Sequence, residues 1–445
     1  MPDGIPSSGW RATFASLSVP EYALYFTGMT AFFAGMNMMI VLRGFLVYDI
    51  TGSKIALSMV MLGVALPMLV MAPIGGVVAD RVDRRSLMIW AQIAVFALNL
   101  ANTVLIIMGI IEFWHLMILS VLSGVAFSFN MPARQAAIPN LVPRELLMNA
   151  MSLSTSAMNA TRIVAPAIGG LLIEPIGIGG AFGVMTAVYG LALFFTFGLP
   201  KMPAAARDAK VTFFGDFAAG FSFIRGNSLV LGLLLVATVP VVFMMPYMTL
   251  LPVFAEDVWD VGPKGLGVLQ AMGGVGGLAG GLIVANMDRN PHKGRIMFFS
   301  SMATGVFIIA FALSPTFVIA LPMLLMVGLG SMIFTTVNNT VVTSVIPDHV
   351  RGRVMSVVMM SFGLMPLGAV PASIAAEYIG TDIVVAIGGV LMMVSIAAFY
   401  ALYPQFRSLD SVIRTERAGR DAEHRERMDR GGRRASRAYR DKVGS

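Results

Sequence analysis

Residues 75–85 read Gly-Gly-Val-Val-Ala-Asp-Arg-Val-Asp-Arg-Arg, a short charged stretch between two long apolar runs. The runs cover 55–79 and 87–111. Each has the length, roughly 20 residues, with which a helix crosses the hydrocarbon core of a bilayer. Helices are expected because an open sheet would leave backbone groups unpaired in lipid. The stretch therefore predicts a tight loop that joins two transmembrane helices.

Apolar runs of this kind fill most of the chain, which has 445 residues, 57% of them hydrophobic and 12% charged. A soluble domain carries about 25% charged residues, so an ordinary soluble enzyme is excluded. We expect an all-α membrane protein with twelve transmembrane helices, arranged as two pseudo-symmetric six-helix bundles. The predicted spans are 22–48, 55–79, 87–111, 113–133, 147–173, 178–199, 229–254, 264–287, 295–314, 316–345, 352–377 and 381–404.

A long polar interruption, residues 200–228, divides the spans into bundles of residues 22–199 and 229–405. Four phenylalanines recur at helical spacing inside this linker and predict an amphipathic helix at the membrane surface: Phe213, Phe214, Phe217 and Phe221. Residues 1–21 and 406–445 are the predicted cytoplasmic N-terminus and charged tail. The tail holds 12 Lys and Arg against 7 Asp and Glu, which is +5 of the net charge of +7. Because the basic excess belongs to the tail, we expect no nucleic-acid partner.

Lys and Arg gather in alternate loops, and this asymmetry predicts the orientation in the membrane. On one side, Lys54 and Lys264 face eight acids: Asp49, Glu112, Glu174, Glu256, Asp257, Asp260, Glu377 and Asp382. The opposite loops are rich in Arg and Lys, so we expect that side and both termini to be cytoplasmic.

The two halves of the chain echo each other at an offset of 208 residues. Asp80-Arg81 corresponds to Asp288-Arg289, and Asn130 corresponds to Asn338. Each pair occupies the same place in its six-span layout. Parallel six-helix repeats are an architecture of secondary transporters, whose substrate site lies between the halves near the membrane midplane.

The loop after the second span resembles the signature of the major facilitator superfamily, Gly-x-x-x-Asp-Arg-x-Gly-Arg-Arg. Here Asp83 replaces the usual second Gly. The resemblance covers roughly residues 15–405 and implies that this loop and its counterpart latch the cytoplasmic side shut. The implied gate residues are Gly76, Asp80, Arg81, Arg84, Arg85, Asp288, Arg289, Arg351 and Arg353. The alternative is a positively charged loop that only sets topology.

The fifth span is similar to the antiporter signature Gly-Pro-x-x-Gly-Gly of export branches of the superfamily. It reads Ala165-Pro166-Ala167-Ile168-Gly169-Gly170, with Ala165 in place of the first Gly. Pro166 removes a helical hydrogen bond, and Gly169 and Gly170 permit a hinge or close helix packing. The resemblance implies export, while a packing seam with no bearing on direction is the alternative.

Polar residues inside spans are costly and therefore indicate a functional site. We predict a substrate cavity, suited to a polar, anionic or amphipathic solute, that is lined by Asn37, Arg43, Asn130, Arg134, Asn159, Arg162, Asn338 and Asn339. The alternative is interhelical hydrogen bonding, with Arg43 and Arg134 reaching toward the membrane interfaces. Arg43 lies about 120° around its helix from the polar stripe of the first span, at 100° per residue.

Other sites are not visible in the sequence. The chain has no Cys and 4 scattered His, so we expect no metal and no cofactor. No Asp or Glu falls in the middle of a span, where proton-coupled carriers usually keep one. An end-located acid such as Glu21 or Glu174, an unconventional proton site and a carrier without proton coupling all stay open.

These observations predict a secondary active transporter rather than an enzyme. The chain is most similar to the enterobactin-exporter-like and drug-efflux branches of the superfamily, and this resemblance implies a location in a bacterial plasma membrane. We expect it to export a small amphipathic or anionic molecule, similar to drugs or siderophores, by alternating access. A nutrient or lysolipid transporter and a transporter-like membrane sensor that moves nothing are the alternatives. The expected partners are the small-molecule substrate, the bilayer and protons, and we expect the protein to be a monomer.

Overall fold

The computed structural model describes residues 14–203, 222–287, 292–346, 354 and 364–402. Every regular element in these residues is a helix. The N-terminal half contains α2 (Pro20–Thr51), α3 (Lys54–Arg81), α4 (Arg84–Ile107), α5 (Phe113–Leu141) and α6 (Leu147–Phe197). The C-terminal half contains α8 (Ser228–Phe243), α9 (Pro246–Val253), the π-helical turn η3 (Phe254–Val258), α10 (Gly262–Asn286), α11 (Lys293–Ala312), α12 (Phe317–Val345), α14 (Met365–Ile379) and α15 (Thr381–Leu402).

Ten stretches of the described residues are helical, long and apolar enough to cross a membrane. Helix α6 has 51 residues, which is about 77 Å at 1.5 Å per residue and enough for two crossings. Gly177 divides it with a φ of +72°, a left-handed conformation that favours glycine. The break falls between the predicted spans 147–173 and 178–199. The membrane-spanning all-α class is therefore confirmed, and the count of twelve crossings stays a prediction.

Close helix packing inside each half depends on small residues. A Cβ at Gly75 of α3 would overlap the backbone oxygen of Ser128 on α5. In the C-terminal half, a Cβ at Gly276 of α10 would overlap the backbone oxygen of Leu325 on α12. Such backbone-to-backbone approach is the usual way in which membrane helices associate, because lipid gives apolar side chains no reason to prefer one another.

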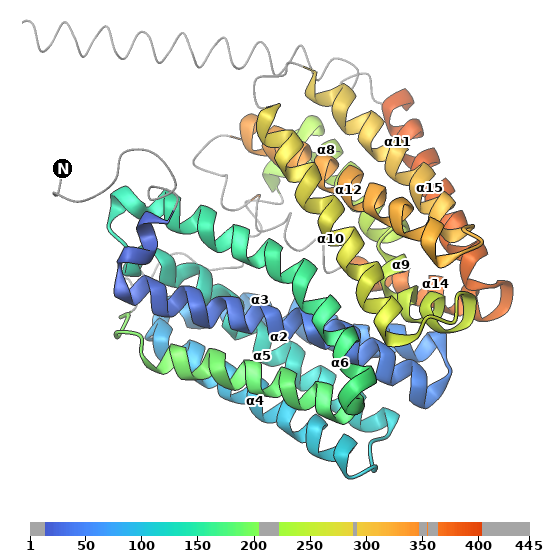
Figure 1. Ribbon diagram of the computed structural model, residues 1–445. Coiled ribbons are helices and arrows are strands. Elements are labelled where there is room, and N and C mark those ends of the chain that lie inside the picture. The colour runs from blue at the N-terminus through green and yellow to red at the C-terminus, as the bar shows by residue number, and fades with distance from the viewer. Residues whose placement is uncertain (1–13, 204–221, 288–291, 347–353, 355–363, 403–445) are drawn as a thin grey trace, which may run out of the picture.

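The charged ends of the helices define two ends of the molecule. We call the end near Asp49, Asp257 and Glu377 the acidic end, and the end near Arg84 and Arg85 the basic end. The helices of the two halves converge at the acidic end and diverge toward the basic end (Figure 1). Helix α6 packs against α10 and α3 packs against α14. These two contacts are the principal ones between the halves.

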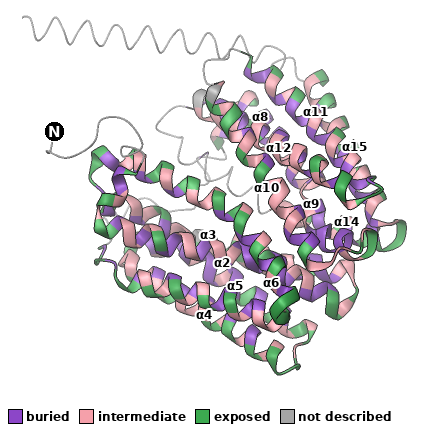
Figure 2. Ribbon diagram, in the orientation of Figure 1, coloured by how far each residue is buried: buried purple, intermediate pink, exposed green. Residues whose placement is uncertain are grey.

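The outward faces of the bundles are apolar. Trp90, Phe194 and Val318 are each at least 70% exposed, and many exposed residues lie on the outer faces of the helices (Figure 2). An exposed apolar surface of this extent would be unstable in water and suits contact with lipid chains.

Three predicted segments lie outside the described residues. They are most of the linker with its four phenylalanines, the charged tail, and the first part of the predicted span 352–377. The predicted domain boundaries therefore stay predictions.

Candidate functional site

Contacts between the halves at the acidic end form what we call the acidic clasp. The Tyr48 hydroxyl of α2 donates a short hydrogen bond to Asp257 of η3. Lys54 of α3 donates from its Nζ to the Ala376 backbone oxygen of α14 at 3.0 Å, and its backbone N–H reaches Glu377 Oε2 at 3.3 Å. The clasp therefore joins the first two helices of one half to the opposite half.

Next to the acidic clasp, α6 and α10 pack closely at glycine residues, and we call this contact the seam. A Cβ at Gly170 would overlap the Pro263 backbone oxygen and lie 3.0 Å from Gly267 Cα. A Cβ at Gly267 would lie 3.0 Å from the Pro166 backbone oxygen. The backbone of α6 is helical at Pro166 and departs from helical geometry at Gly177. Pro166 and Gly170 therefore lie where α6 packs against α10, while a Cβ at Gly169 would face Met38 of α2. A hinge at these three residues stays a prediction.

The eight predicted cavity residues do not gather in one place. Arg43, Asn130 and Arg134 are buried inside the N-terminal half, where Asn37 also donates to the Phe33 backbone oxygen of its own helix at 2.8 Å. These four side chains are buried in one half of the protein, and a substrate cavity lined by them stays a prediction.

We call Arg43, Asn130, Arg134 and Tyr189 the arginine cluster. Arg43 is 6% exposed and donates from Nη1 to Ser120 Oγ at 3.1 Å. Arg134 is 3% exposed and donates from Nε to Asn130 Oδ1 at 2.6 Å. Both guanidinium groups therefore bond to residues of their own half.

Asn159 and Arg162 lie on α6 where it faces the opposite half. Arg162 is exposed and lies within electrostatic range of Tyr247 on α9, across the seam. Ser152, Thr155 and Ser156 are exposed nearer the basic end of α6. This helix therefore carries exposed polar residues from its basic end as far as Arg162.

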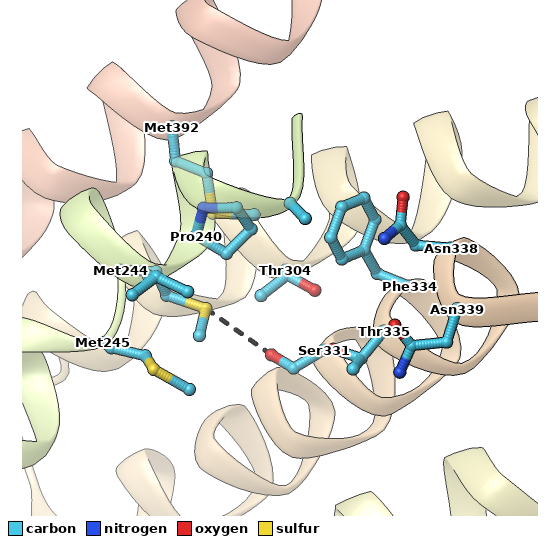
Figure 3. A pocket seen from close by; sticks show the side chains of 12 residues that line it. Pro240, Met244, Met245, Thr304, Ser331, Phe334, Thr335, Asn338, Asn339 and Met392 are labelled. Atoms are coloured by element: carbon cyan, nitrogen blue, oxygen red, sulfur yellow. Dashed lines mark hydrogen bonds between the residues drawn. The ribbon is translucent and has the colours of Figure 1, made fainter. Parts of the chain in front are cut away.

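Asn338 and Asn339 line a cavity of about 70 Å³ within the C-terminal half. Its walls come from α8, α11, α12 and α15, and Ser331 contacts the Met244 sulfur at 3.5 Å (Figure 3). Asn338 is buried, and its Oδ1 has no hydrogen-bond donor among the described residues. The cavity is far smaller than the roughly 300 Å³ at which drug-sized sites begin, so in this state it fits at most a small polar group.

The loop between α3 and α4 forms its hydrogen bonds with residues of the N-terminal half. Asp83 caps α4 by accepting from Ser86 N at 2.8 Å and also accepts from Met202 N at 2.6 Å. Arg84 and Arg85 donate to the backbone oxygens of Ala136 and Phe197 at 3.0 and 2.7 Å.

Partial burial of Asp83 acts to raise its pKa. The hydrogen bonds from Ser86 and the backbone N–H of Met202, with the charge of Arg85, outweigh that effect and lower the pKa below its ordinary value. The carboxylate is therefore held in its charged form at the basic end.

The predicted gate is only partly within view. Asp288, Arg289, Arg351 and Arg353 lie outside the described residues, and so does the side chain of Asp80. Arg81 is exposed, and a Cβ at Gly76 would meet nothing within 4 Å. The bonds of Arg84 and Arg85 stay in their own half rather than crossing the seam, so the latch between the halves remains a prediction.

Sequence reasoning missed the residues that make the clasp and the aromatic member of the cluster. Tyr48 and Asp257 carry no motif. Tyr189 could have been noticed as a hydroxyl-bearing residue in the middle of an apolar span.

No group of three or more His, Cys, Asp or Glu in the described residues is placed to hold a metal ion.

A family model described as transmembrane secretion effector matches residues 11–431. The chain belongs to this family of major facilitator transporters. Among its relatives, macrolide efflux protein A of Streptococcus pyogenes is 27% identical over 365 residues, 81% of this chain and 90% of the relative. Enterobactin exporter EntS of Shigella flexneri is 26% identical over 305 residues, 68% of this chain and 71% of the relative.

Solved structures with the same fold support this assignment. The nucleoside transporter NupG superposes with a TM-score of 0.68 at 14% identity, covering 85% of this chain and 98% of NupG. An inward-facing bacterial homologue of the lysosomal transporter Spinster has a TM-score of 0.66 at 15% identity, covering 92% and 99% of the two chains. The protein is therefore a multi-pass membrane transporter of the major facilitator fold and not an enzyme.

Proposed function

We propose that this transporter exports a small amphipathic or anionic molecule across a bacterial plasma membrane by alternating access. The observation that carries the proposal is the asymmetry of the seam. The acidic end is joined by the clasp, while the exposed polar face of α6 extends toward the basic end, where the halves diverge. With the basic end in the cytoplasm, as the positive-inside rule requires, this arrangement is inward-facing and ready to take up a cytoplasmic solute.

The names of the relatives support an export direction and the class of solute. One relative is named for macrolide efflux and another for enterobactin export. Macrolides and enterobactin-like siderophores are therefore the first compounds to test. An amphipathic solute suits the seam, because α6 offers hydroxyl groups and Arg162 beside apolar helix surface.

Proton coupling is part of the proposal, and the acidic clasp is where we place it. Glu256 has one carboxylate oxygen, Oε1, that is buried without a hydrogen-bond donor in the described residues. Asp49, Asp257 and Asp260 are all within its electrostatic range. A proton taken up from outside would remove one of these like charges and favour the closed clasp.

The test is compound accumulation in cells with and without the protein, repeated with a protonophore. Proton-driven export predicts lower accumulation in cells that contain the protein, and the protonophore should abolish the difference. Higher accumulation would favour uptake of a nutrient or lysolipid. A difference that persists with the protonophore would refute proton coupling but not export.

Variants separate a transporter from a sensor. We expect Asn159→Ala and Arg162→Ala to reduce export at least about tenfold, as loss of a charged hydrogen bond to solute would. Thr27→Ala is a matched control, because Thr27 is an exposed hydroxyl that bonds only within its own helix. Unchanged accumulation of every compound in the folded wild type and variants would favour the sensor.

A further inference from the structure

The arginine cluster places two permanent positive charges in the interior of the N-terminal half. Arg43 and Arg134 are 6% and 3% exposed, and their helices α2 and α5 lie within the bundle. An arginine is not deprotonated in a protein. A buried charge without a partner of opposite sign strongly destabilises a protein. A charged residue inside a membrane bundle therefore indicates a site that binds a ligand or an ion.

The cluster offers more donors than its own residues accept. Among the described residues, Arg43 Nε, Arg134 Nη2 and Asn130 Nδ2 have no hydrogen-bond acceptor, and the Tyr189 hydroxyl has no partner. Tyr189 is 2% exposed and Asn130 is fully buried. The cluster thus gathers four buried groups without a partner among the described residues, although most buried polar groups in proteins are paired.

Carboxylates do not neutralise this charge in the described residues. The titratable groups that interact with Arg43 and Arg134 there are tyrosines, Tyr189 for the first and Tyr25 with Tyr189 for the second. The nearest acid along α2 is Asp49, which is exposed at the acidic end. The described surroundings therefore offer the two guanidinium groups a few neutral acceptors and no negative charge.

The two guanidinium groups contact different residues of α2, an aromatic ring for Arg134 and a methionine sulfur for Arg43. The Arg134 guanidinium lies 4.3 Å from the Phe32 ring centroid, and Phe32 packs edge-to-face on Tyr189 with centroids 5.6 Å apart. Arg43 folds back toward Met39, with Nη2 3.2 Å from its sulfur. Met39 is seven residues from Phe32, about 10 Å along α2. Tyr189 lies within electrostatic range of both guanidinium groups.

We propose that the arginine cluster is an anion-binding site inside the N-terminal half. Its ligand is a carboxylate, a phosphate or a halide. The anion is either free in solution or the acidic group of the transported solute. This inference is independent of the direction of transport, because it concerns equilibrium binding to the protein.

Chloride-35 NMR on the protein purified in an uncharged detergent tests the proposal. Site binding broadens the chloride resonance, and a competing anion reverses the broadening. We expect wild type to show broadening that saturates with chloride. Acetate or inorganic phosphate should compete if free anions are the ligand. An acidic solute identified by the accumulation assay should compete where these two do not if the site recognises the solute.

Variants assign the broadening to the cluster. Arg43→Gln and Arg134→Gln should each weaken binding at least about tenfold, and Tyr189→Phe about fivefold, as expected for charged and neutral hydrogen bonds. Arg144→Gln, at an exposed arginine between α5 and α6 to which no binding role is assigned, is the matched control and should bind as wild type does.

Tyr189→Phe and Arg134→Lys keep the test informative if a glutamine variant fails to fold. The lysine variant keeps the charge and should retain binding more closely than the glutamine variant. The proposal would be overturned if wild-type broadening is no greater than that of Arg43→Gln/Arg134→Gln, or if Arg144→Gln loses as much binding as the cluster variants.

Discussion

The seam between α6 and α10 leads to a sharp prediction about Gly170. An alanine there would place its Cβ 3.0 Å from Gly267 Cα and closer still to the Pro263 backbone oxygen. Ordinary contacts begin near 3.4 Å, so the two backbones must separate by at least about 0.4 Å. Overpacking of this kind costs about 1–3 kcal/mol.

That cost falls on the state in which the acidic end is closed, because only there do the two backbones meet. We therefore expect Gly170→Ala to move the equilibrium toward the state with an open acidic end by about 5- to 150-fold. Gly169→Ala is the matched control on the next residue. Its Cβ would lie 3.6 Å from Met38 backbone atoms, an ordinary contact, and it should leave the equilibrium unchanged.

Spin labels provide the assay, since the chain contains no cysteine and needs no background substitution. Labels at Glu174→Cys and Lys264→Cys, both exposed at the acidic end, report the separation of α6 and α10. Electron–electron double resonance should show a larger long-distance population in Gly170→Ala than in Gly169→Ala. Identical distance distributions in the two variants would refute the reasoning.

Three further predictions follow from the described contacts. Tyr48→Phe removes the hydrogen bond to Asp257, so the acidic end should open about two- to tenfold more often in the same spin-label assay, and an unchanged distribution would contradict this. Asp83→Ala should lower stability by about 1 kcal/mol through loss of a helix cap, as thermal unfolding would measure. Because the folded protein lowers the pKa of Asp83, its contribution is complete above the unfolded pKa, about 3.9, and is lost as pH falls through the folded pKa. Asp83→Asn should therefore flatten the decline of stability below about pH 4, and an unaltered decline would count against it. Gly276→Ala should lower the melting temperature by several degrees and Gly277→Ala should not, because a Cβ would overlap α12 at the first position and meet nothing within 4 Å at the second.

The transmembrane helices were predictable because their signal is local. A run of apolar residues and the charges at its ends determine where a helix crosses the bilayer. The predicted break between 147–173 and 178–199 coincides with Gly177 of α6. The charge asymmetry of the loops and the half repeat likewise needed no contact information.

The candidate site was harder to predict because it depends on which way a helix is rotated. The sequence places Arg43 and Asn37 on one helix but does not say which bundle surface each faces. Arg43 turns into its own half, while Arg162 lies on the face of α6 that meets the opposite half. The clasp pair Tyr48–Asp257 joins residues 209 positions apart, and no local pattern marks such a contact.

The hydrogen bonds of the α3–α4 loop, which stay within one half, determine how this transporter responds to substitutions there. Asp83, Arg84 and Arg85 keep their partners whichever way the two halves are tilted, since every partner travels with them as part of the same rigid body. Damage at these three positions would thus appear first as a protein that melts early or accumulates poorly in the membrane.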